Sequence, residues 1–231
     1  MTKKPVRDGS RRVDDEGTAS AAAFVPDTTS LPTLNDAAQE CRGCDLYKFA
    51  TQAVFGAGPR AARLMLVGEQ PGDQEDRQGE PFVGPSGALL DKALAAARIP
   101  RKQVYVTNAV KHFKWEPRGK RRIHKKPRAS EIKACRPWLN AELRSVRPAV
   151  IVCLGATAAQ SVFGTTFRLM QQHGQVLPTL LGPPGVATIH PSAVLRATTA
   201  EARRLAYEML VADLATAAKL AATRPLPPAR K

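Results

Sequence analysis

The sequence lacks any stretch long and apolar enough to span a bilayer, and its N-terminus lacks the charged-then-apolar pattern of a secretory signal. We therefore expect a cytoplasmic protein, in which thiols stay free and disulfides are unlikely. No internal repeat is visible. The 231 residues are expected to form one domain with tails, because 43% apolar residues suffice for a core.

Acidic side chains are also scarce, with 20 Asp and Glu against 35 Lys and Arg, and the formal net charge is +15. Residues 111–133 alone carry ten basic and two acidic side chains, a net charge of +8. Such a concentration predicts a polyanionic partner, with nucleic acid as the first choice. The alternative is a solvated loop with surplus charge.

Short apolar runs at residues 64–67, 104–107, 150–154 and 186–189 predict strands that are covered on both faces. Helical patterns lie between them at residues 86–98 and 201–220 and in a segment that Ser130 caps and Pro148 stops. This alternation predicts a three-layer α/β/α fold with a central, mainly parallel four-stranded sheet. Residues 1–33 and 223–231 are expected to be disordered tails around a domain at 34–222.

The segment 68–87, GEQPGDQEDRQGEPFVGPSG, places five acidic side chains and one aromatic ring directly after a predicted strand. Ligands of open α/β sheets bind at such carboxyl-end loops, so the segment predicts a pocket. Asn108, His190 and His124 follow strand ends or lie in the basic loop, where they can reach the same site. Each also has an ordinary interpretation as a turn, loop or solvated residue.

Four cysteines, Cys41, Cys44, Cys135 and Cys153, are spaced as one C-x-x-C pair and two single residues. Zinc sites usually take two local pairs, so the split second pair favours an iron-sulfur cluster held by all four thiolates. Zinc and unliganded buried thiols are the alternatives. A cluster with four protein ligands would pin the N-terminal segment to the sheet and would do no chemistry.

The motifs GEQPG, PFVG, TN and HPSAVLR, together with the cysteine spacing, resemble the iron-sulfur uracil-DNA glycosylases of family 4 over residues 35–220. Gln70 and the KRRIH segment at 120–124 are similar to the UdgX branch, whose members become covalently joined to uracil-containing DNA. The resemblance implies a 4Fe-4S cluster and uracil in DNA as substrate. Single-stranded DNA is expected to be preferred, because an unpaired uracil avoids the cost of unstacking.

The resemblance also implies roles for individual residues. Phe82 would stack on a flipped uracil, and the Asn108 amide would pair with its O4 and N3-H. His190 would stabilise the departing base, while Glu69 would lie near the sugar and orient His124, which would attack the sugar in place of water. Gly68 and Gln70 complete the uracil site; the alternative for Gln70 is that it only shapes the loop. The residues expected to hold DNA are Lys120, Arg121, Arg122, Lys125, Lys126 and Ser192, and Trp115 or His112 is expected to stack on a neighbouring base.

Three hypotheses therefore compete for a protein expected to be a monomer. The first is a single-turnover uracil-DNA crosslinker, the second is a glycosylase that turns over, and the third is a non-enzymatic nucleic-acid module with a structural metal centre. The first and second share every motif except KRRIH and Gln70.

Overall fold

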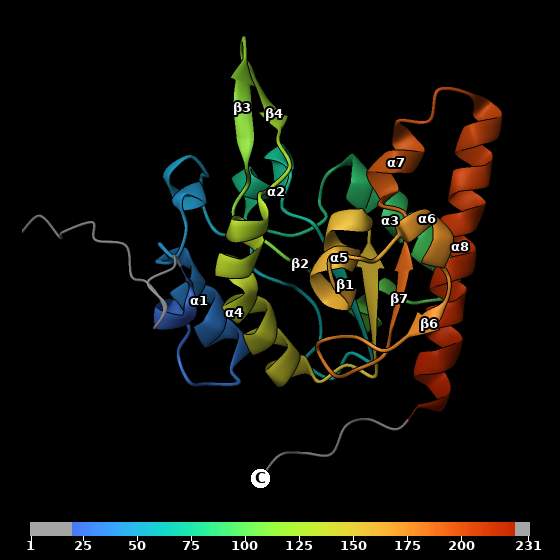
Figure 1. Ribbon diagram of the computed structural model, residues 1–231, viewed down its shortest axis with the longest axis horizontal. Coiled ribbons are helices and arrows are strands. Elements are labelled where there is room, and N and C mark those ends of the chain that lie inside the picture. The colour runs from blue at the N-terminus through green and yellow to red at the C-terminus, as the bar shows by residue number, and fades with distance from the viewer. Residues whose placement is uncertain (1–19, 225–231) are drawn as a thin grey trace, which may run out of the picture.

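A five-stranded sheet forms the centre of the protein, whose computed structural model describes residues 20–224 (Figure 1). The strand order is β2 (Val104–Asn108), β1 (Leu64–Gly68), β5 (Val150–Leu154), β7 (Gly185–Thr188) and β6 (Val176–Leu177). The first four strands run parallel, and β6 pairs antiparallel with β7. The mainly parallel α/β fold is confirmed, but the prediction of four strands is wrong by one.

Alternate residues of the strands face two separate apolar layers, as a fully buried sheet requires. Leu64 and Leu66 of β1 pack in the layer formed with helices α3 (Pro85–Ala96), α7 (Pro191–Leu195) and α8 (Ala200–Thr223). Met65 and Val67 pack in the opposite layer, which includes α4 (Ala129–Val146) and α5 (Ala156–Phe163). Helices thus cover both faces. None of the helices within residues 20–224 has the length and apolarity of a membrane span.

Shorter elements complete the chain: α1 (Leu31–Gln39), α2 (Asp73–Gln78), α6 (Leu169–Gln172) and 3-10 turns at Ala22–Phe24, Asp45–Lys48 and Arg101–Gln103. Helix α4 begins one residue before the predicted cap. Arg128 is its N-cap, and the Glu131 side chain accepts a hydrogen bond from the Arg128 backbone N-H at 2.6 Å. Ser130 therefore lies inside the first turn.

The N-terminal segment differs from the prediction of a disordered tail at residues 1–33. Residues 20–33 are described, and they contain the first 3-10 turn and the start of α1. Ala21 is buried, and its backbone N-H donates to the carbonyl oxygen of Ala134 in α4 at 2.8 Å. The prediction underestimated this segment because its small residues carry no periodic signal. Residues 1–19 of that tail and 225–231 of the C-terminal tail lie outside the described residues.

A β-hairpin formed by β3 (Trp115–Arg118) and β4 (Arg121–His124) occupies the segment predicted to be a basic loop. Trp115 pairs with His124 at its base, and Arg118 pairs with Arg121 at its tip. Gly119 turns the chain there with a positive φ of 59°, a backbone conformation that favours glycine. The hairpin stands out from the body of the protein beside α2 (Figure 1).

Candidate active site

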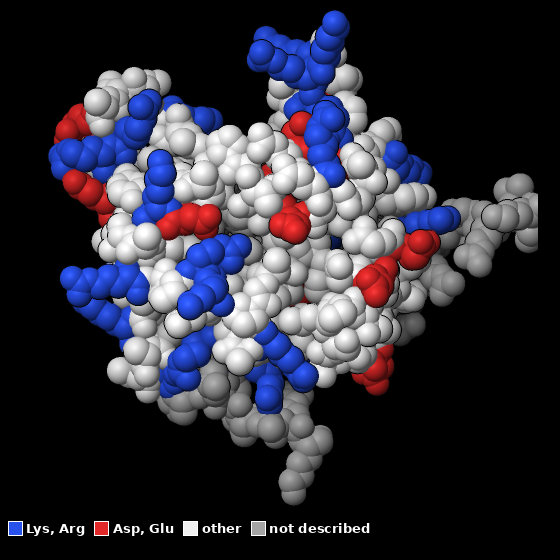
Figure 2. Space-filling model, turned by 180° about the vertical axis from the view of Figure 1, so that it is seen from behind, with Lys and Arg blue, Asp and Glu red and all other residues white. Residues whose placement is uncertain are grey.

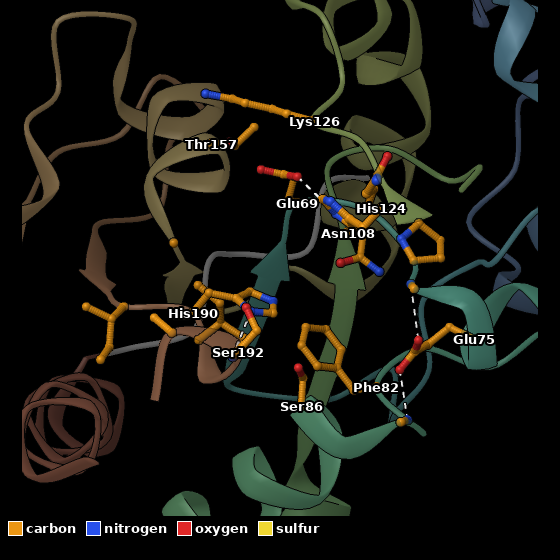
Figure 3. A pocket seen from close by; sticks show the side chains of 18 of the residues that line it. Glu69, Glu75, Phe82, Ser86, Asn108, His124, Lys126, Thr157, His190 and Ser192 are labelled. Carbon is orange, nitrogen blue, oxygen red and sulfur yellow. Dashed lines mark hydrogen bonds and ion pairs between the residues drawn. The ribbon is translucent and has the colours of Figure 1, made fainter. Parts of the chain in front are cut away.

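A pocket of about 960 Å³ opens at the carboxyl ends of β1, β2, β5 and β7 (Figure 3). This is the edge of a parallel sheet where ligands are expected. Eight of the predicted site residues line it: Glu69, Gln70, Phe82, Asn108, His124, Lys126, His190 and Ser192. The structure therefore brings residues from four strand ends and from the hairpin to one cavity.

The Glu69 carboxylate lies at the end of β1, and its Oε1 is 3.3 Å from Nε2 of His124 at the base of the hairpin. Burial raises the pKa of Glu69. Hydrogen bonds with His124 and Thr157 and the nearby histidines oppose burial, and the net result is a pKa below the ordinary glutamate value. Glu69 is therefore an anion at neutral pH that can accept the proton of an imidazole N-H. Figure 3 shows Glu69 between His124 and Thr157.

Phe82 and Asn108 line the pocket, and Gly68 at the end of β1 lies against both of their side chains without lining it. The Asn108 side chain is buried, and among the described residues its amide is not used in a hydrogen bond, so it remains available to a ligand. A Cβ atom at Gly68 would overlap with Oδ1 of Asn108 and would lie 2.8 Å from Cζ of Phe82. Only glycine therefore allows both side chains to lie over the end of β1. Phe82 itself has a positive φ of 60°.

The tautomer of His190 is fixed by Ser192. The Ser192 backbone N-H donates to Nδ1 of His190 at 3.1 Å, so Nδ1 carries no proton and Nε2 is the N-H donor. Oγ of Ser192 lies 2.8 Å from the same nitrogen and accepts a hydrogen bond from Arg196. Burial lowers the pKa of His190 to about 4; the nearby Glu69 opposes this shift, and Arg196 and His124 add smaller lowering contributions. His190 is therefore a neutral hydrogen-bond donor.

The acidic residues of the segment after β1 have structural contacts. Glu75 accepts hydrogen bonds from the backbone N-H groups of Gly72 at 3.1 Å and Gly84 at 2.8 Å, which fixes the loop that carries Phe82. Asp76 accepts from the backbone N-H of Thr51 at 2.9 Å. These two carboxylates hold the pocket wall in position.

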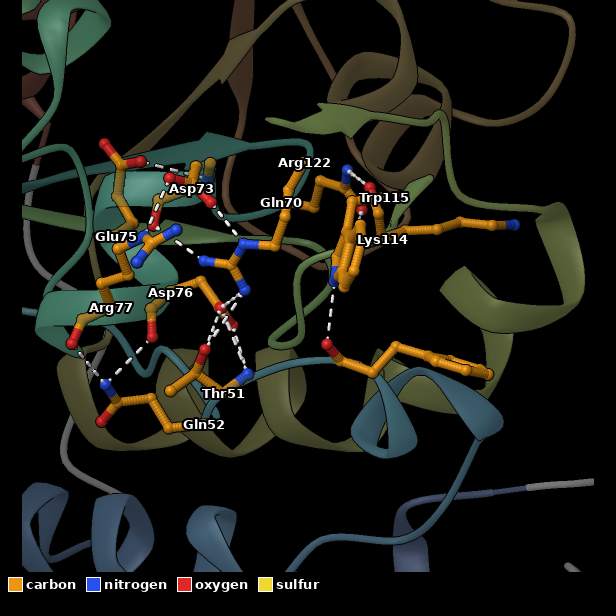
Figure 4. A network of polar contacts seen from close by, with 12 residues as sticks. Thr51, Gln52, Gln70, Asp73, Glu75, Asp76, Arg77, Lys114, Trp115 and Arg122 are labelled. Atoms are coloured by element: carbon orange, nitrogen blue, oxygen red, sulfur yellow. Dashed lines mark hydrogen bonds and ion pairs between the residues drawn. The ribbon is translucent and has the colours of Figure 1, made fainter. Parts of the chain in front are cut away.

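Gln70 contacts the hairpin. Its side-chain N-H groups donate to the carbonyl oxygens of Lys114 and Lys125, each at 3.1 Å, and its Oε1 accepts from the Lys114 N-H at 3.1 Å. Both amide hydrogens therefore hold the two ends of the hairpin together (Figure 4). Gln70 also lines the pocket, but its amide donors are already used, which favours the interpretation that it shapes the loop; its contact with uracil stays a prediction.

Arg122, expected to bind DNA, is instead held inside the protein. Its guanidinium contacts the carboxylates of Asp73 and Asp76 in α2, with Nη1 2.6 Å from Oδ2 of the fully buried Asp76 (Figure 4). The side chain is 15% exposed. Arg122 therefore anchors the strand that ends in His124.

The other basic residues around the hairpin remain near solvent. Lys120 and Arg121 lie at its exposed tip, which forms the blue projection of Figure 2. Lys125 pairs with Glu116 at 2.7 Å, and Lys126 lines the pocket. His112 is 4% exposed, so the prediction that it stacks on a base is wrong.

Comparison with other proteins identifies the family of this chain. Residues 55–215 match the model of the Uracil DNA glycosylase superfamily. The chain belongs to this superfamily. It is 42% identical to a Type-4 uracil-DNA glycosylase of Archaeoglobus fulgidus over 175 residues, which cover 71% of this chain and 84% of the relative. It is 36% identical to a Type-4 uracil-DNA glycosylase of Thermotoga maritima over 179 residues, which cover 77% of this chain and 90% of the relative.

In this member of the uracil-DNA glycosylase superfamily, the four cysteines do not converge. Cys41 and Cys135 share an apolar cluster between α1 and α4, and Cys44 packs against it. Burial, together with the charges of Cys44 and Cys41, raises the pKa of Cys135 against the opposing effect of Lys111. Cys153 lies on β5 in the other apolar layer, where burial alone raises its pKa.

A cluster held by all four cysteines therefore does not fit this structure. Within residues 20–224, His, Cys, Asp and Glu side chains form no group of three or more that is arranged to hold a metal ion. The prediction failed at Cys153 because Cys135 lies on the face of α4 that packs toward α1, whereas Cys153 packs on the face of α4 that covers the sheet.

Two further residues of this superfamily member were not predicted. Thr157, in the first turn of α5, lines the pocket and hydrogen-bonds Glu69. It follows a strand end, the same signal that pointed to Asn108. Arg196 also lines the pocket and donates to Ser192 at 2.8 Å. It is the last residue of the motif HPSAVLR, so its place in that motif was the available signal.

Proposed function

We propose that the protein recognises uracil in DNA, cleaves the bond between the base and the sugar, and becomes joined to the sugar through His124. One observation carries the proposal: the ring of His124 lies at the pocket mouth, 3.3 Å from Glu69. The names of the relatives support uracil in DNA as the substrate. The hairpin that positions His124 supports the covalent step.

Base selection follows from the amide of Asn108. Its N-H can donate to O4 of uracil and its oxygen can accept from N3-H, whereas cytosine presents the opposite pattern at both positions. Phe82 offers an apolar ring face beside this amide. Together they would hold a uracil that has left the base stack.

Bond cleavage leaves the electron pair of the C1′–N1 bond on the base and positive charge on the sugar. The Nε2-H of His190 donates to the base as negative charge develops on its O2. The ionised Glu69 stabilises the sugar cation. Because His190 is neutral, it supplies a hydrogen bond without transferring a proton in this step.

The lone pair of a neutral His124 ring then forms the new bond to C1′. The proton on the other ring nitrogen can pass to Glu69, so the adduct gains no net charge. The bond between the imidazole and the anomeric carbon has no obvious route to hydrolysis, so the protein reacts once. A glycosylase that turns over, with water attacking the same carbon, is the second candidate and agrees with the names of the relatives.

The experiment uses the full chain with a uracil-containing oligonucleotide and a denaturing gel. A band that stays shifted in detergent supports the covalent reaction, alkali-labile DNA without it supports the second candidate, and neither product supports a non-enzymatic module. In His124→Ser the covalent band should disappear while free uracil is released repeatedly. Loss of both activities would make His124 a general catalytic group and would contradict the proposal.

Substrate form and salt dependence extend the proposal. Single-stranded DNA should react faster than duplex DNA, because extrusion of a paired base costs a few kcal/mol. Binding before the reaction should weaken steeply with salt, because cations at the hairpin tip such as Lys120 and Arg121 neutralise phosphates. The covalent product should not dissociate at any salt concentration.

For the cysteines we propose a reduced role: Cys41, Cys44 and Cys135, but not Cys153, are candidate ligands of an iron-sulfur cluster, which would have to draw the three thiols together because they form no ligand group in the described structure. The support is their shared apolar cluster. Cys135→Ala should lower the iron and sulfide content of anaerobically prepared protein, while Cys153→Ala, equally buried, should keep both. Iron-free, colourless wild-type protein would overturn the cluster.

A further inference from the structure

An aromatic and basic surface lies beside the base of the hairpin, outside the pocket lining. It is formed by the residues after the C-x-x-C pair. Phe49, which follows the 3-10 turn Asp45–Lys48, has a side chain that is 65% exposed. It is the single aromatic ring among the exposed large apolar side chains of residues 20–224. An exposed phenylalanine has no role in the core, and its ring is accessible to a ligand.

Trp115 holds this segment against the hairpin. Its Nε1-H donates to the carbonyl oxygen of Phe49 at 2.8 Å, and Figure 4 shows the indole directed toward that carbonyl. The guanidinium of the anchored Arg122 lies 5.5 Å from the centre of the Trp115 ring. The hydrogen bond therefore fixes the Phe49 backbone next to Trp115, and the cation–π contact with Arg122 fixes the Trp115 ring.

Basic and aromatic residues alternate around the same segment. Arg42 lies 5.9 Å from the centre of the Tyr47 ring, and Lys48 separates Tyr47 from Phe49 in the chain. Aromatic rings between cations are typical of surfaces that bind single-stranded nucleic acid, where bases stack and phosphates are neutralised. The core of a protein interface is instead depleted of charged residues, so the composition favours nucleic acid over a protein partner.

The surface is close to the reacting atoms. Trp115 is the direct partner of His124 in the hairpin, and paired residues of an antiparallel ladder have Cα atoms roughly 5 Å apart. Successive nucleotides of a stacked strand advance about 3.4 Å. A strand whose sugar lies at His124 therefore reaches Trp115 and Phe49 within a few nucleotides.

We propose that Tyr47, Phe49 and Trp115 form a stacking platform for unpaired bases on one side of the nucleotide in the pocket. The inference deepens the proposed function, and it rests on that function only for the path of the strand. The platform explains a preference for single-stranded DNA independently of base extrusion, because the bases of a duplex do not expose their faces.

The test separates the platform from the chemistry. Binding of a uracil-free 20-nucleotide oligothymidine is measured by fluorescence anisotropy for the wild type, Phe49→Ala and Phe49→Tyr. Loss of one stacked base should weaken binding about tenfold in Phe49→Ala, and Phe49→Tyr should bind like the wild type. Leu180→Ala is the matched control, since Leu180 is 66% exposed and lies elsewhere. Equal affinity of Phe49→Ala and wild type would overturn the platform.

Two further measurements keep the result interpretable. Uracil removal by the wild type is measured on a trinucleotide with a central uracil and on longer uracil substrates. If the wild type fails on this trinucleotide and on longer uracil substrates, the proposed function fails while the binding test still stands. Tryptophan emission should be quenched by oligothymidine, because Trp115 is accessible and the second tryptophan, Trp138, is fully buried. Unchanged emission at saturating oligothymidine would also overturn the platform.

Discussion

At the scale of single residues, the pocket depends on the absence of a side chain at Gly68. A Cβ atom there would displace both the Asn108 amide and the Phe82 ring. Gly68→Ala should therefore lower the rate of uracil removal more than tenfold, with a loss of unfolding free energy of about 1 to 3 kcal/mol from overpacking. Single-turnover rates and urea unfolding measure the two effects.

The control for Gly68 is Gly119 at the hairpin tip, where an added Cβ meets nothing within 4 Å. Gly119→Ala should cost about 1 kcal/mol, because its positive φ disfavours alanine, and it should leave the rate of uracil removal nearly unchanged. Equal rate losses in both variants would show that general destabilisation, not displacement of Asn108 and Phe82, explains the effect.

The lowered pKa of His190 predicts a pH dependence of stability. The pKa is about 4 in the folded protein and about 6.5 in an unfolded chain, so between these values the unfolded state binds more protons. Stability should therefore fall as the pH decreases from 6.5 to 4. Since the ring is partly exposed, we expect a loss of about 2 kcal/mol relative to His190→Gln. Parallel urea curves at pH 7.5, 5.5 and 4.5 test this, and identical pH profiles for the two proteins would contradict it.

The sequence predicted which residues reach the pocket better than what each of them contacts. Glu69, Phe82, Asn108, His124 and His190 all line it. For Glu69, Asn108 and His190 the reason is that parallel strands end at one edge of a sheet. Gln70 and Arg122 were expected to face the ligand but hold the hairpin instead. Their partners are two backbone carbonyls and two carboxylates of α2. These partners lie far away in the sequence and come close only in the fold, so residue spacing does not reveal them.

At the scale of elements, the hairpin acts as a rigid support for His124. Arg122 joins β4 to α2 through Asp73 and the fully buried Asp76. Arg122→Met should destabilise the fold by about 2 to 3 kcal/mol, because it leaves a buried carboxylate without its cation. It should also slow formation of the covalent product more than tenfold, since His124 lies two residues further along the strand.

The matched control is Glu116→Gln on the same hairpin. Its ion pair with Lys125 is more than half exposed on both sides, so its loss should leave both the stability and the reaction rate nearly unchanged. Rates are compared well below the unfolding temperature of both variants. An unstable Arg122→Met protein that reacts at the wild-type rate would exclude a positioning role for the anchor.

The same hairpin shows where prediction of elements from sequence fails. Runs of apolar residues gave four strands and the main helices correctly within one to three residues. Strand β6 was missed because Val176–Leu177 is too short to form a pattern. The hairpin was missed because β4 begins with two arginines and has no apolar alternation, and its support comes from tertiary contacts with α2. Local sequence cannot encode such contacts.

At the scale of the whole molecule, one buried ion pair joins the sheet to the helical layer. Nζ of Lys111 lies 2.6 Å from Oε2 of Glu142 in α4, and the two side chains are 1% and 0% exposed. Glu142 also accepts from the Gly56 N-H at 2.9 Å and from the Thr107 hydroxyl at 2.8 Å. Lys111 donates to the carbonyl oxygen of Asn108 at 2.8 Å, which links this network to the pocket.

The energetic role of this pair is testable by removing one charge or both. Lys111→Met alone leaves an uncompensated buried carboxylate and should cost about 3 to 5 kcal/mol of unfolding free energy. The double variant Lys111→Met with Glu142→Gln removes the unpaired charge while the amide oxygen still accepts from Gly56. It should recover most of that loss, because attraction between buried charges is largely offset by their desolvation. A double variant as unstable as Lys111→Met would show that the lost hydrogen bonds, rather than a stranded charge, control the stability of this core.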